Sequence, residues 1–298
     1  MTGNNKRILY LLLGIFSGTA AFAAVEILNG AGLPNYLLLA LIQGAALGFI
    51  FGFTFGFADG IIYRELKTGL IRALTAAAAG AVTAAAAQVI ASQGMLLSAR
   101  LAGFGYDRSM DVLLPLWRGF GWMLMGAAIG AIDGLQKKAI RRAAAGAVGG
   151  LTGGLIGGLA FEFLIRLIPD AVYIKAAGLI LMGALIGLFI GEFERRFSFA
   201  RLRILNGPLK DREYLIVKLK TSIGNSVRND IAINGYKTIP EGLLTRSGGE
   251  INFEIQEEIA AASADITLLN DQPVSMRQML KYQDVIQLGS LKLIYLPL

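Results

Sequence analysis

Apolar residues form long runs over the first two thirds of the chain, separated by short polar segments. A helix needs about 20 mostly apolar residues to cross the roughly 30 Å hydrocarbon core of a bilayer. The runs long enough for this predict six membrane-spanning helices, at Ile8–Leu28, Tyr36–Tyr63, Leu70–Gln93, Pro115–Leu135, Ala143–Ile168 and Ala171–Phe193. The connection at Gly94–Leu114 is the longest between them and is expected to be a loop.

The last third of the chain has a different pattern, in which apolar and polar residues alternate in short runs between turn residues. Alternation with a period of two is typical of half-buried strands. The expected strands are Tyr214–Leu219, Ser222–Ile223, Ile231–Ile233, Gly242–Arg246, Ile251–Gln256, Ile266–Leu269, Val285–Leu288 and Leu291–Tyr295. Short strands at this spacing predict a β-sandwich. The chain is therefore expected to divide into a polytopic transmembrane domain at 1–199 and an all-β domain at 200–298.

Composition supports this division and excludes several kinds of chemistry. Hydrophobic residues make up 55% of the chain and charged residues 16%, against 45–50% and about a quarter in soluble domains. The chain has no cysteine and no histidine, which excludes zinc-finger and iron–sulfur ligation, disulfides, and thiol or imidazole nucleophiles. Neither a P-loop nor a kinase motif occurs. We therefore expect no enzymatic activity, no cofactor and no metal site.

The net charge of +7 comes mainly from basic residues near the ends of the expected spans. Basic residues concentrate on the cytoplasmic side of membrane proteins. One side would hold Lys6, Arg7, Arg64, Lys67, Arg72, Lys137, Lys138, Arg141, Arg142, Arg195, Arg196, Arg201 and Arg203, and the other Arg100, Arg108, Arg166 and Lys175. This predicts a multi-pass protein of the inner (plasma) membrane with both termini in the cytoplasm. The near-neutral last third gives no sign of nucleic-acid binding.

The first span allows an alternative interpretation. Lys6 and Arg7, the apolar run that follows them and the small residues Ala20–Ala24 also resemble a secretory signal peptide. Cleavage there would leave five spans. We favour a retained helix, because the internal repeat described next includes it.

Glycines recur at every fourth residue in three of the expected spans: Gly44, Gly48, Gly52, Gly56 and Gly60, then Gly126, Gly130 and Gly134, then Gly183, Gly187 and Gly191. This spacing removes side chains from one stripe of a helix and allows close packing of backbones. The simplest account is a glycine-zipper helical hairpin present as three parallel repeats. We favour packing over pore lining, and such faces also suit a homo-oligomer.

Polar residues near the span ends form two sets. Asp59, Asp133 and Glu192 lie at the cytoplasmic ends, and Glu26, Gln88 and Glu162 lie towards the opposite ends. Charged groups within spans are costly and often functional. One interpretation is a proton or cation path with an inner and an outer polar ring. The other, which we favour, is that these groups reach the interface and pair with neighbours such as Arg64, Lys137 or Arg195.

The last third also contains a family signature. Thr221–Asn225 reads Thr-Ser-Ile-Gly-Asn and Asn229–Ile233 reads Asn-Asp-Ile-Ala-Ile. These segments, followed by Ile266–Val274 and by Leu280–Gly289, resemble in order and spacing the signature of forkhead-associated (FHA) domains. The resemblance implies an FHA-like sandwich that binds a protein partner through loops at one end.

FHA domains recognise phosphothreonine, but the family's contact residues are incomplete in this chain. Asn225 occupies the position of the family's arginine, and the Ser-x-x-His segment has no counterpart. Asn270 matches the hairpin asparagine, yet Asp271 follows it where the family has glycine. Loss of the arginine removes a charge-assisted contact to phosphate. Two alternatives remain: Ser226 and Arg228 substitute in phosphopeptide binding, or the loops bind proteins without phosphate, which we favour.

These observations lead to a functional hypothesis with alternatives. The leading one is a membrane-anchored scaffold or adaptor that presents an FHA-like module to a cytoplasmic or membrane protein, phosphorylated or not. The alternative is a channel, a transporter or a membrane subunit of a larger complex, with a regulatory FHA-like domain. A third interpretation is signalling alongside a serine/threonine kinase.

Overall fold

The computed structural model describes residues 3–32, 35–63, 66–105, 109–168, 171–226, 229–233, 235–236, 239–255, 267–274 and 277–297. The chain folds into two compact units. The first, Asn4–Glu194, is helical, and the second consists mainly of the residues from Arg195 onward. Each unit is considered by itself.

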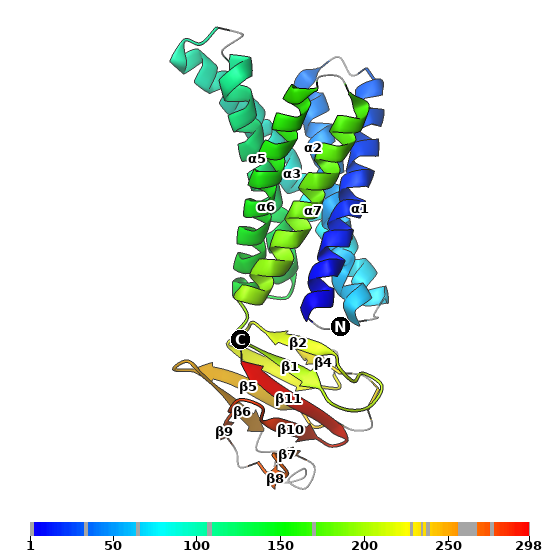
Figure 1. Ribbon diagram of the computed structural model, residues 1–298, viewed down its shortest axis with the longest axis vertical. Coiled ribbons are helices and arrows are strands. Elements are labelled where there is room, and N and C mark those ends of the chain that lie inside the picture. The colour runs from blue at the N-terminus through cyan, green and yellow to red at the C-terminus, as the bar shows by residue number, and fades with distance from the viewer. Residues whose placement is uncertain are drawn as a thin grey trace. The chain divides into compact units, whose positions relative to one another are not determined.

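The helical unit is a bundle of long helices that lie side by side (Figure 1). They are α1 (Gly3–Gly30), α2 (Tyr36–Tyr63), α3 (Leu66–Ala102), α5 (Leu114–Gln136), α6 (Ile140–Leu167) and α7 (Val172–Arg196), with a short π-helix, η1 (Ser109–Leu113), before α5. Within the described residues, six helices are long and apolar enough to cross a membrane. The prediction of six long apolar helices is therefore confirmed.

Helix α3 differs from its prediction because it continues past Gln93 to Ala102. The added segment is rich in leucine, alanine, methionine and arginine, all good helix formers, so much of the expected loop is helical instead. With 37 residues, α3 is about 55 Å long at 1.5 Å per residue. Its end and the start of α5 project beyond the other helices (Figure 1).

Glycines allow three pairs of helices to touch through their backbones. A Cβ atom on either member of each of the following pairs would overlap the backbone of the other: Gly48 and Gly80 between α2 and α3, Gly130 and Gly146 between α5 and α6, and Gly183 and Gly14 between α7 and α1. The closest contacts thus join α2 to α3, α5 to α6, and the last long helix to the first. Such approach supplies the packing that holds apolar helices together.

A layer of buried apolar side chains fills the middle of the bundle. Phe51, Met182 and Ile186 have no exposed surface, and Leu47 and Met125 retain 1%. They belong to one hydrophobic cluster to which α1, α2, α3, α5 and α7 all contribute. The centre of the bundle is therefore mainly apolar.

The second unit contains two sheets. Its strands are β1 (Ala200–Ile204), β2 (Glu213–Ile216), β3 (Lys220–Gly224), β4 (Ile231–Ala232), β5 (Gly242–Ser247), β6 (Glu250–Ile255), β7 (Thr267–Leu269), β8 (Gln272–Pro273), β9 (Arg277–Met279), β10 (Val285–Leu288) and β11 (Leu291–Pro297). One sheet has the order β2-β1-β11-β10-β7-β8 and the other β4-β3-β5-β6-β9. The prediction of a β-sandwich is confirmed in that the unit is built from two sheets of short strands.

Strands β1, β8 and β9 are additions to the predicted set. Strand β1 lies between β2 and β11, where Leu202 is opposite both Tyr214 and Tyr295. Its alternating residues are buried, and the intervening Arg203 binds Glu213 of β2 at 2.7 Å. From the sequence, Arg201 and Arg203 were expected to belong to the basic stretch after the last span, and for this reason β1 was not predicted. Residue Ile266, expected at the start of β7, lies outside the described residues.

We expect Gly130→Ala to destabilise the helical unit, because the added methyl group would overlap the carbonyl of Gly146. Overpacking of this kind costs about 1–3 kcal/mol, which would appear as a lower Tm of the purified protein in mild detergent. Gly30→Ala is the matched control, since a Cβ at Gly30 meets nothing within 4 Å. Equal Tm values for the two variants would contradict the assigned α5–α6 contact.

Candidate functional site

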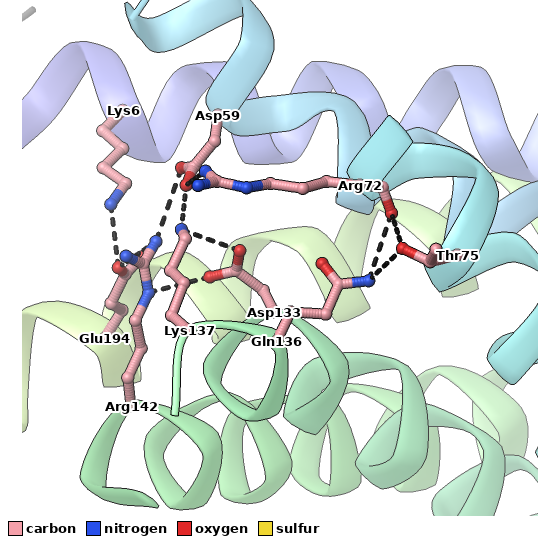
Figure 2. A network of polar contacts seen from close by, with 9 residues as sticks. All are labelled: Lys6, Asp59, Arg72, Thr75, Asp133, Gln136, Lys137, Arg142 and Glu194. Carbon is pink, nitrogen blue, oxygen red and sulfur yellow. Dashed lines mark hydrogen bonds and ion pairs between the residues drawn. The ribbon is translucent and has the colours of Figure 1, made fainter. Parts of the chain in front are cut away.

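Charged side chains from all six long helices or their ends gather at one end of the helical unit (Figure 2). We call this cluster the polar network and define it by its charged members: Lys6, Asp59, Arg72, Asp133, Lys137, Arg142 and Glu194. Lys137 directly follows α5, and the other six come from α1, α2, α3, α5, α6 and α7.

Asp59 is almost fully buried, with 2% of its side chain exposed. Its carboxylate contacts Lys137, and it lies 3.5 Å from Arg142 and 3.8 Å from Arg72. Lys137 and Arg142 each also bind Asp133 at 2.8 Å. Two acids from α2 and α5 are thus held by the same two bases.

Glu194 completes the polar network and links it to α1. Its Oε1 atom accepts from Lys6 at 2.8 Å and lies 2.9 Å from Arg142. Arg142 therefore contacts all three acids of the polar network. Breaking a buried ion pair by removing one partner is costly, typically 3–5 kcal/mol, because the other charge stays buried. These contacts accordingly fix the ends of the helices relative to one another.

The structure brings together two of the three acids predicted for this end. Asp59 and Asp133 lie in the polar network and pair with Lys137 as expected. The expectation that these acids reach the interface is wrong for Asp59, whose side chain is buried under the converging helix ends. Glu192 instead pairs with Arg7 at 3.1 Å. Glu194, which the sequence reading missed, takes the buried place because it follows Met182, Ile186 and Ile190 at intervals of four on the buried face of α7. This four-residue spacing was the sequence signal that identifies Glu194 as a buried residue. Arg64, a suggested partner, lies outside the described residues.

The second predicted polar set lines a single cavity. Glu26, Gln88 and Glu162 all border a space of about 230 Å³ between the helices. Glu162 is 3.3 Å from Arg118 of α5, and Glu26 is 3.8 Å from Lys175 of α7. Both acids are thus paired with a cation from a neighbouring helix. The favoured interpretation predicted pairing of this kind, but it did not name Arg118 or Lys175 as the partners.

The apolar layer separates this cavity from the polar network. Along α5, Arg118 lines the cavity, Met125 and Ile129 are buried in the layer, and Asp133 belongs to the polar network. At 1.5 Å per residue, Arg118 and Asp133 are about 22 Å apart. The described side chains between them are apolar on the buried face, so the two polar sets do not form a continuous path in this structure.

In the β unit, the FHA-like motif builds the turn after β3. Gly224 has no side chain, and a Cβ there would overlap the side chain of Asn229. Asn229 donates from Nδ2 to Glu241 Oε1 at 3.1 Å. Asp230 accepts from the Ser222 backbone at 3.1 Å, and its own amide donates to Ser222 Oγ at 2.9 Å. The Gly and Asn-Asp of the motif therefore have local structural roles.

The predicted partner-binding residues of this turn are only partly described. Asn225 is exposed and Ser226 is half-buried. The Ser226 carbonyl accepts from the Asn229 amide at 3.0 Å. Arg228 lies outside the described residues. At the described positions, the neutral Asn225 side chain thus lies in a turn that also contains Asp230, whose carboxylate pairs with Lys218 at 2.6 Å.

Asn270 and Asp271 lie elsewhere, in the tight turn between β7 and β8. Both have positive φ, 51° and 61°, a conformation that Asn and Asp adopt more readily than most residues. Asn270 accepts from the Val285 amide at 2.9 Å and donates to Asp284 at 2.8 Å. Its side chain therefore holds β10, while the side chain of Asp271 is 83% exposed and pairs with Lys292 at 3.7 Å.

Asn225 and Asn270 follow strands of different sheets, because β3 belongs to one sheet and β7 to the other. The end of β3 is beside the end of β6, since Ile223 is opposite Gly242 and Gly242 is opposite Ile255. The described hydrogen bonds and ion pairs do not join Asn225 or Ser226 to Asn270 or Asp271. A common binding site for these residues stays a prediction.

Comparison with known proteins gives a limited result. No protein-family model and no curated protein sequence matches the chain. Among solved structures, it resembles a chain from a structural and functional analysis of phosphothreonine-dependent FHA domain interactions, with 20% identity over 34% of this chain and 100% of that one and a TM-score of 0.28.

A second similar structure is Mycobacterium tuberculosis EmbR in complex with a low-affinity phosphopeptide, with 14% identity over 97% of this chain and 71% of that one and a TM-score of 0.29. These matches agree with the FHA-like resemblance of the C-terminal region. Because both TM-scores are low, they carry no argument about what this chain binds.

We expect Asn270→Ala to loosen the β7–β10 pairing, because it removes two hydrogen bonds and puts alanine at positive φ. The expected loss is about 1–2 kcal/mol. Hydrogen exchange of peptides covering β10 in the full-length protein measures it, and Asn225→Ala, at an exposed position, is the control. Exchange of β10 in Asn270→Ala that is as slow as in the control would show that the Asn270 side chain does not hold β10.

Proposed function

We propose that this protein is a membrane-anchored scaffold or adaptor. Its six apolar helices form the anchor, and its FHA-like unit binds a protein partner at the membrane surface. The proposal includes no enzymatic step. The observation that carries it is the pairing of a bundle of six apolar helices with a separate compact β unit that contains the FHA-like signature residues.

The helical unit has the properties expected of an anchor. Its long helices satisfy their backbone hydrogen bonds internally, as the apolar part of a bilayer requires. Apolar side chains such as Phe16, Val82 and Phe163 are more than 60% exposed on the bundle surface. In water such a surface would be a liability, whereas in lipid it is the favoured arrangement.

The proposed orientation places both termini and the β unit in the cytoplasm. It rests on the bias of basic residues towards one end of the spans. Lys6, Arg72, Lys137 and Arg142 lie at that end, in the polar network. Arg118 and Lys175 line the cavity near the other end.

Single-cysteine labelling tests this orientation, because the natural chain contains no cysteine. A cysteine at Gly105, between α3 and η1, should react with a membrane-impermeant maleimide in intact cells. A cysteine at exposed Glu250 of β6 should react only after the membrane is permeabilised. The reverse pattern would place the β unit outside the cell, and equal labelling of both sites in intact cells would argue against a membrane-spanning bundle.

We further propose that partner binding does not need phosphate. The turn after β3 carries Asn225 where the FHA signature has an arginine, and the carboxylates of Asp230 and Glu241 belong to the same turn region. The Asp230 carboxylate pairs with Lys218 at 2.6 Å, so the proposal rests on residue 225, where the neutral Asn225 offers a phosphate no charge-assisted bond. Asn270 is engaged by Asp284 and Val285 and is not part of this surface.

A transporter or channel with a regulatory FHA-like domain is the second candidate. The cavity of about 230 Å³ with its two carboxylates favours it. The apolar layer between the cavity and the polar network opposes it, because conduction needs a hydrated path. The scaffold therefore explains the two units with fewer assumptions.

Site-specific cross-linking in cells tests the scaffold. A photo-reactive amino acid at Asn225 should capture a protein partner, and the same group at Glu250, at the start of β6, serves as the control. Phosphatase treatment of permeabilised cells before irradiation should leave the adduct unchanged. Loss of the adduct after phosphatase treatment would establish phosphate-dependent binding. Loss of the adduct in an Asp59→Asn, Asp133→Asn, Glu192→Gln variant that still folds would favour a role centred on the helices.

A further inference from the structure

The cavity of the helical unit has features that neither anchoring nor scaffolding requires. We propose that it binds a small zwitterion, a molecule that carries an ammonium and a carboxylate or phosphate group on an apolar body. The proposal is independent of the partner bound by the β unit. It rests on the charges that line the cavity, on two buried polar atoms without a hydrogen-bond partner among the described residues, and on the apolar walls.

The charged residues that line the cavity balance. They are two carboxylates, Glu26 and Glu162, and two cations, Arg118 and Lys175. A ligand with a single charge would leave this site with a net charge among apolar helices, and unbalanced charge in such surroundings is costly. A ligand with one positive and one negative group leaves the net charge of the cavity unchanged, and it gives each of the two ion pairs a further partner.

Helix α5 supplies donors for the anionic group. Arg118 and Trp122 are four residues apart, so their side chains lie on one face of the helix. Trp122 is 7% exposed, and its buried Nε1 atom has no hydrogen-bond partner among the described residues. An indole nitrogen is a donor only, and a guanidinium has five N–H donors. Both residues line the cavity. An anionic group there accepts from Arg118, and it accepts from the covered Trp122 nitrogen once the neighbouring side chains move aside.

Helix α1 supplies the acceptor for the ammonium group. The Oε1 atom of Glu26 is buried and has no hydrogen-bond partner in the described structure. Its contact with Lys175, at 3.8 Å, is an ion pair that is too long for a hydrogen bond. A ligand ammonium, with three donors, supplies the missing hydrogen bond once the side chains that cover this oxygen move aside.

The apolar part of the cavity accommodates the body of such a ligand. Leu47 and Leu179, which are 1% and 2% exposed, belong to the apolar layer and also line the cavity. Phe161 meets Trp122 edge to face, with ring centroids 6.0 Å apart. A volume of about 230 Å³ is smaller than drug-sized sites of 300–1,000 Å³. It therefore fits a compact molecule such as an apolar amino acid, or the headgroup of a zwitterionic lipid.

These two sources share one chemistry, and the experiment distinguishes them. The full-length protein in nanodiscs of phosphatidylglycerol is titrated with L-leucine and L-phenylalanine, and with 2-phenylethylamine and 3-phenylpropanoate as single-charge analogues of phenylalanine. In a second arm, native mass spectrometry compares retention of phosphatidylethanolamine with that of phosphatidylglycerol after delipidation. Binding of an amino acid at least tenfold tighter than of both analogues identifies a free zwitterion, and selective retention of phosphatidylethanolamine identifies a lipid headgroup.

Two variants locate the binding. Glu26→Gln removes the charge that faces the ammonium, and Trp122→Phe removes the indole donor while keeping an aromatic ring. Each should weaken binding about tenfold, as expected for one lost hydrogen bond to a charged group. Glu192→Gln is the matched control, because Glu192 pairs with Arg7 and does not line the cavity, and it should bind within about twofold of the natural protein.

The proposal is overturned if neither the amino acids nor phosphatidylethanolamine binds selectively, or if a single-charge analogue binds as tightly as phenylalanine. Unchanged affinity in both folded variants also overturns it. If Glu26→Gln does not fold, Trp122→Phe decides, because it introduces no charge and no new polar group.

Discussion

Direct backbone contact between glycines determines how the helices are arranged. Where Gly48 meets Gly80 and Gly130 meets Gly146, no side chain separates the two helices. The same contact joins Gly183 of α7 to Gly14 of α1, so the last long helix packs against the first. Helices this close place the residues at their ends within reach of one another, and the positions of the charged side chains follow from that.

The charges at the helix ends depend on this closeness. Asp59, Asp133 and Glu194 lie near the C-terminal ends of their helices, where the helix dipole disfavours an acid, and Arg142 lies near an N-terminal end, where it disfavours a base. Each group alone would be unstable there. Bringing the ends together pairs the acids with Arg142 and its neighbours, so that two unfavourable placements offset each other.

Long-period patterns in the sequence predicted the architecture, and single contacts were harder to predict. Runs of apolar residues identified all six long helices, and alternation identified most of the strands. The glycine spacing pointed to Glu192, which follows Gly191, whereas the four-residue spacing of Met182, Ile186 and Ile190 was the signal that leads to Glu194 in the polar network. Likewise, Asn270 matched a family motif, but whether its side chain faces a partner or the neighbouring strand depends on the register of β7 and β10.

The glycine contacts also bear on the choice between an anchor and a transporter. A path between the cavity and the polar network would have to pass Phe51, Met182 and Ile186, which are fully buried. Side chains in a packed interface can change rotamer, but glycine contacts have no side chain to rotate, so opening them requires whole helices to separate. Interfaces of this kind favour one arrangement over a continuous range of deformations. The helical unit is therefore better suited to keep one arrangement of its helices, as the proposed anchor requires, than to alternate between two states.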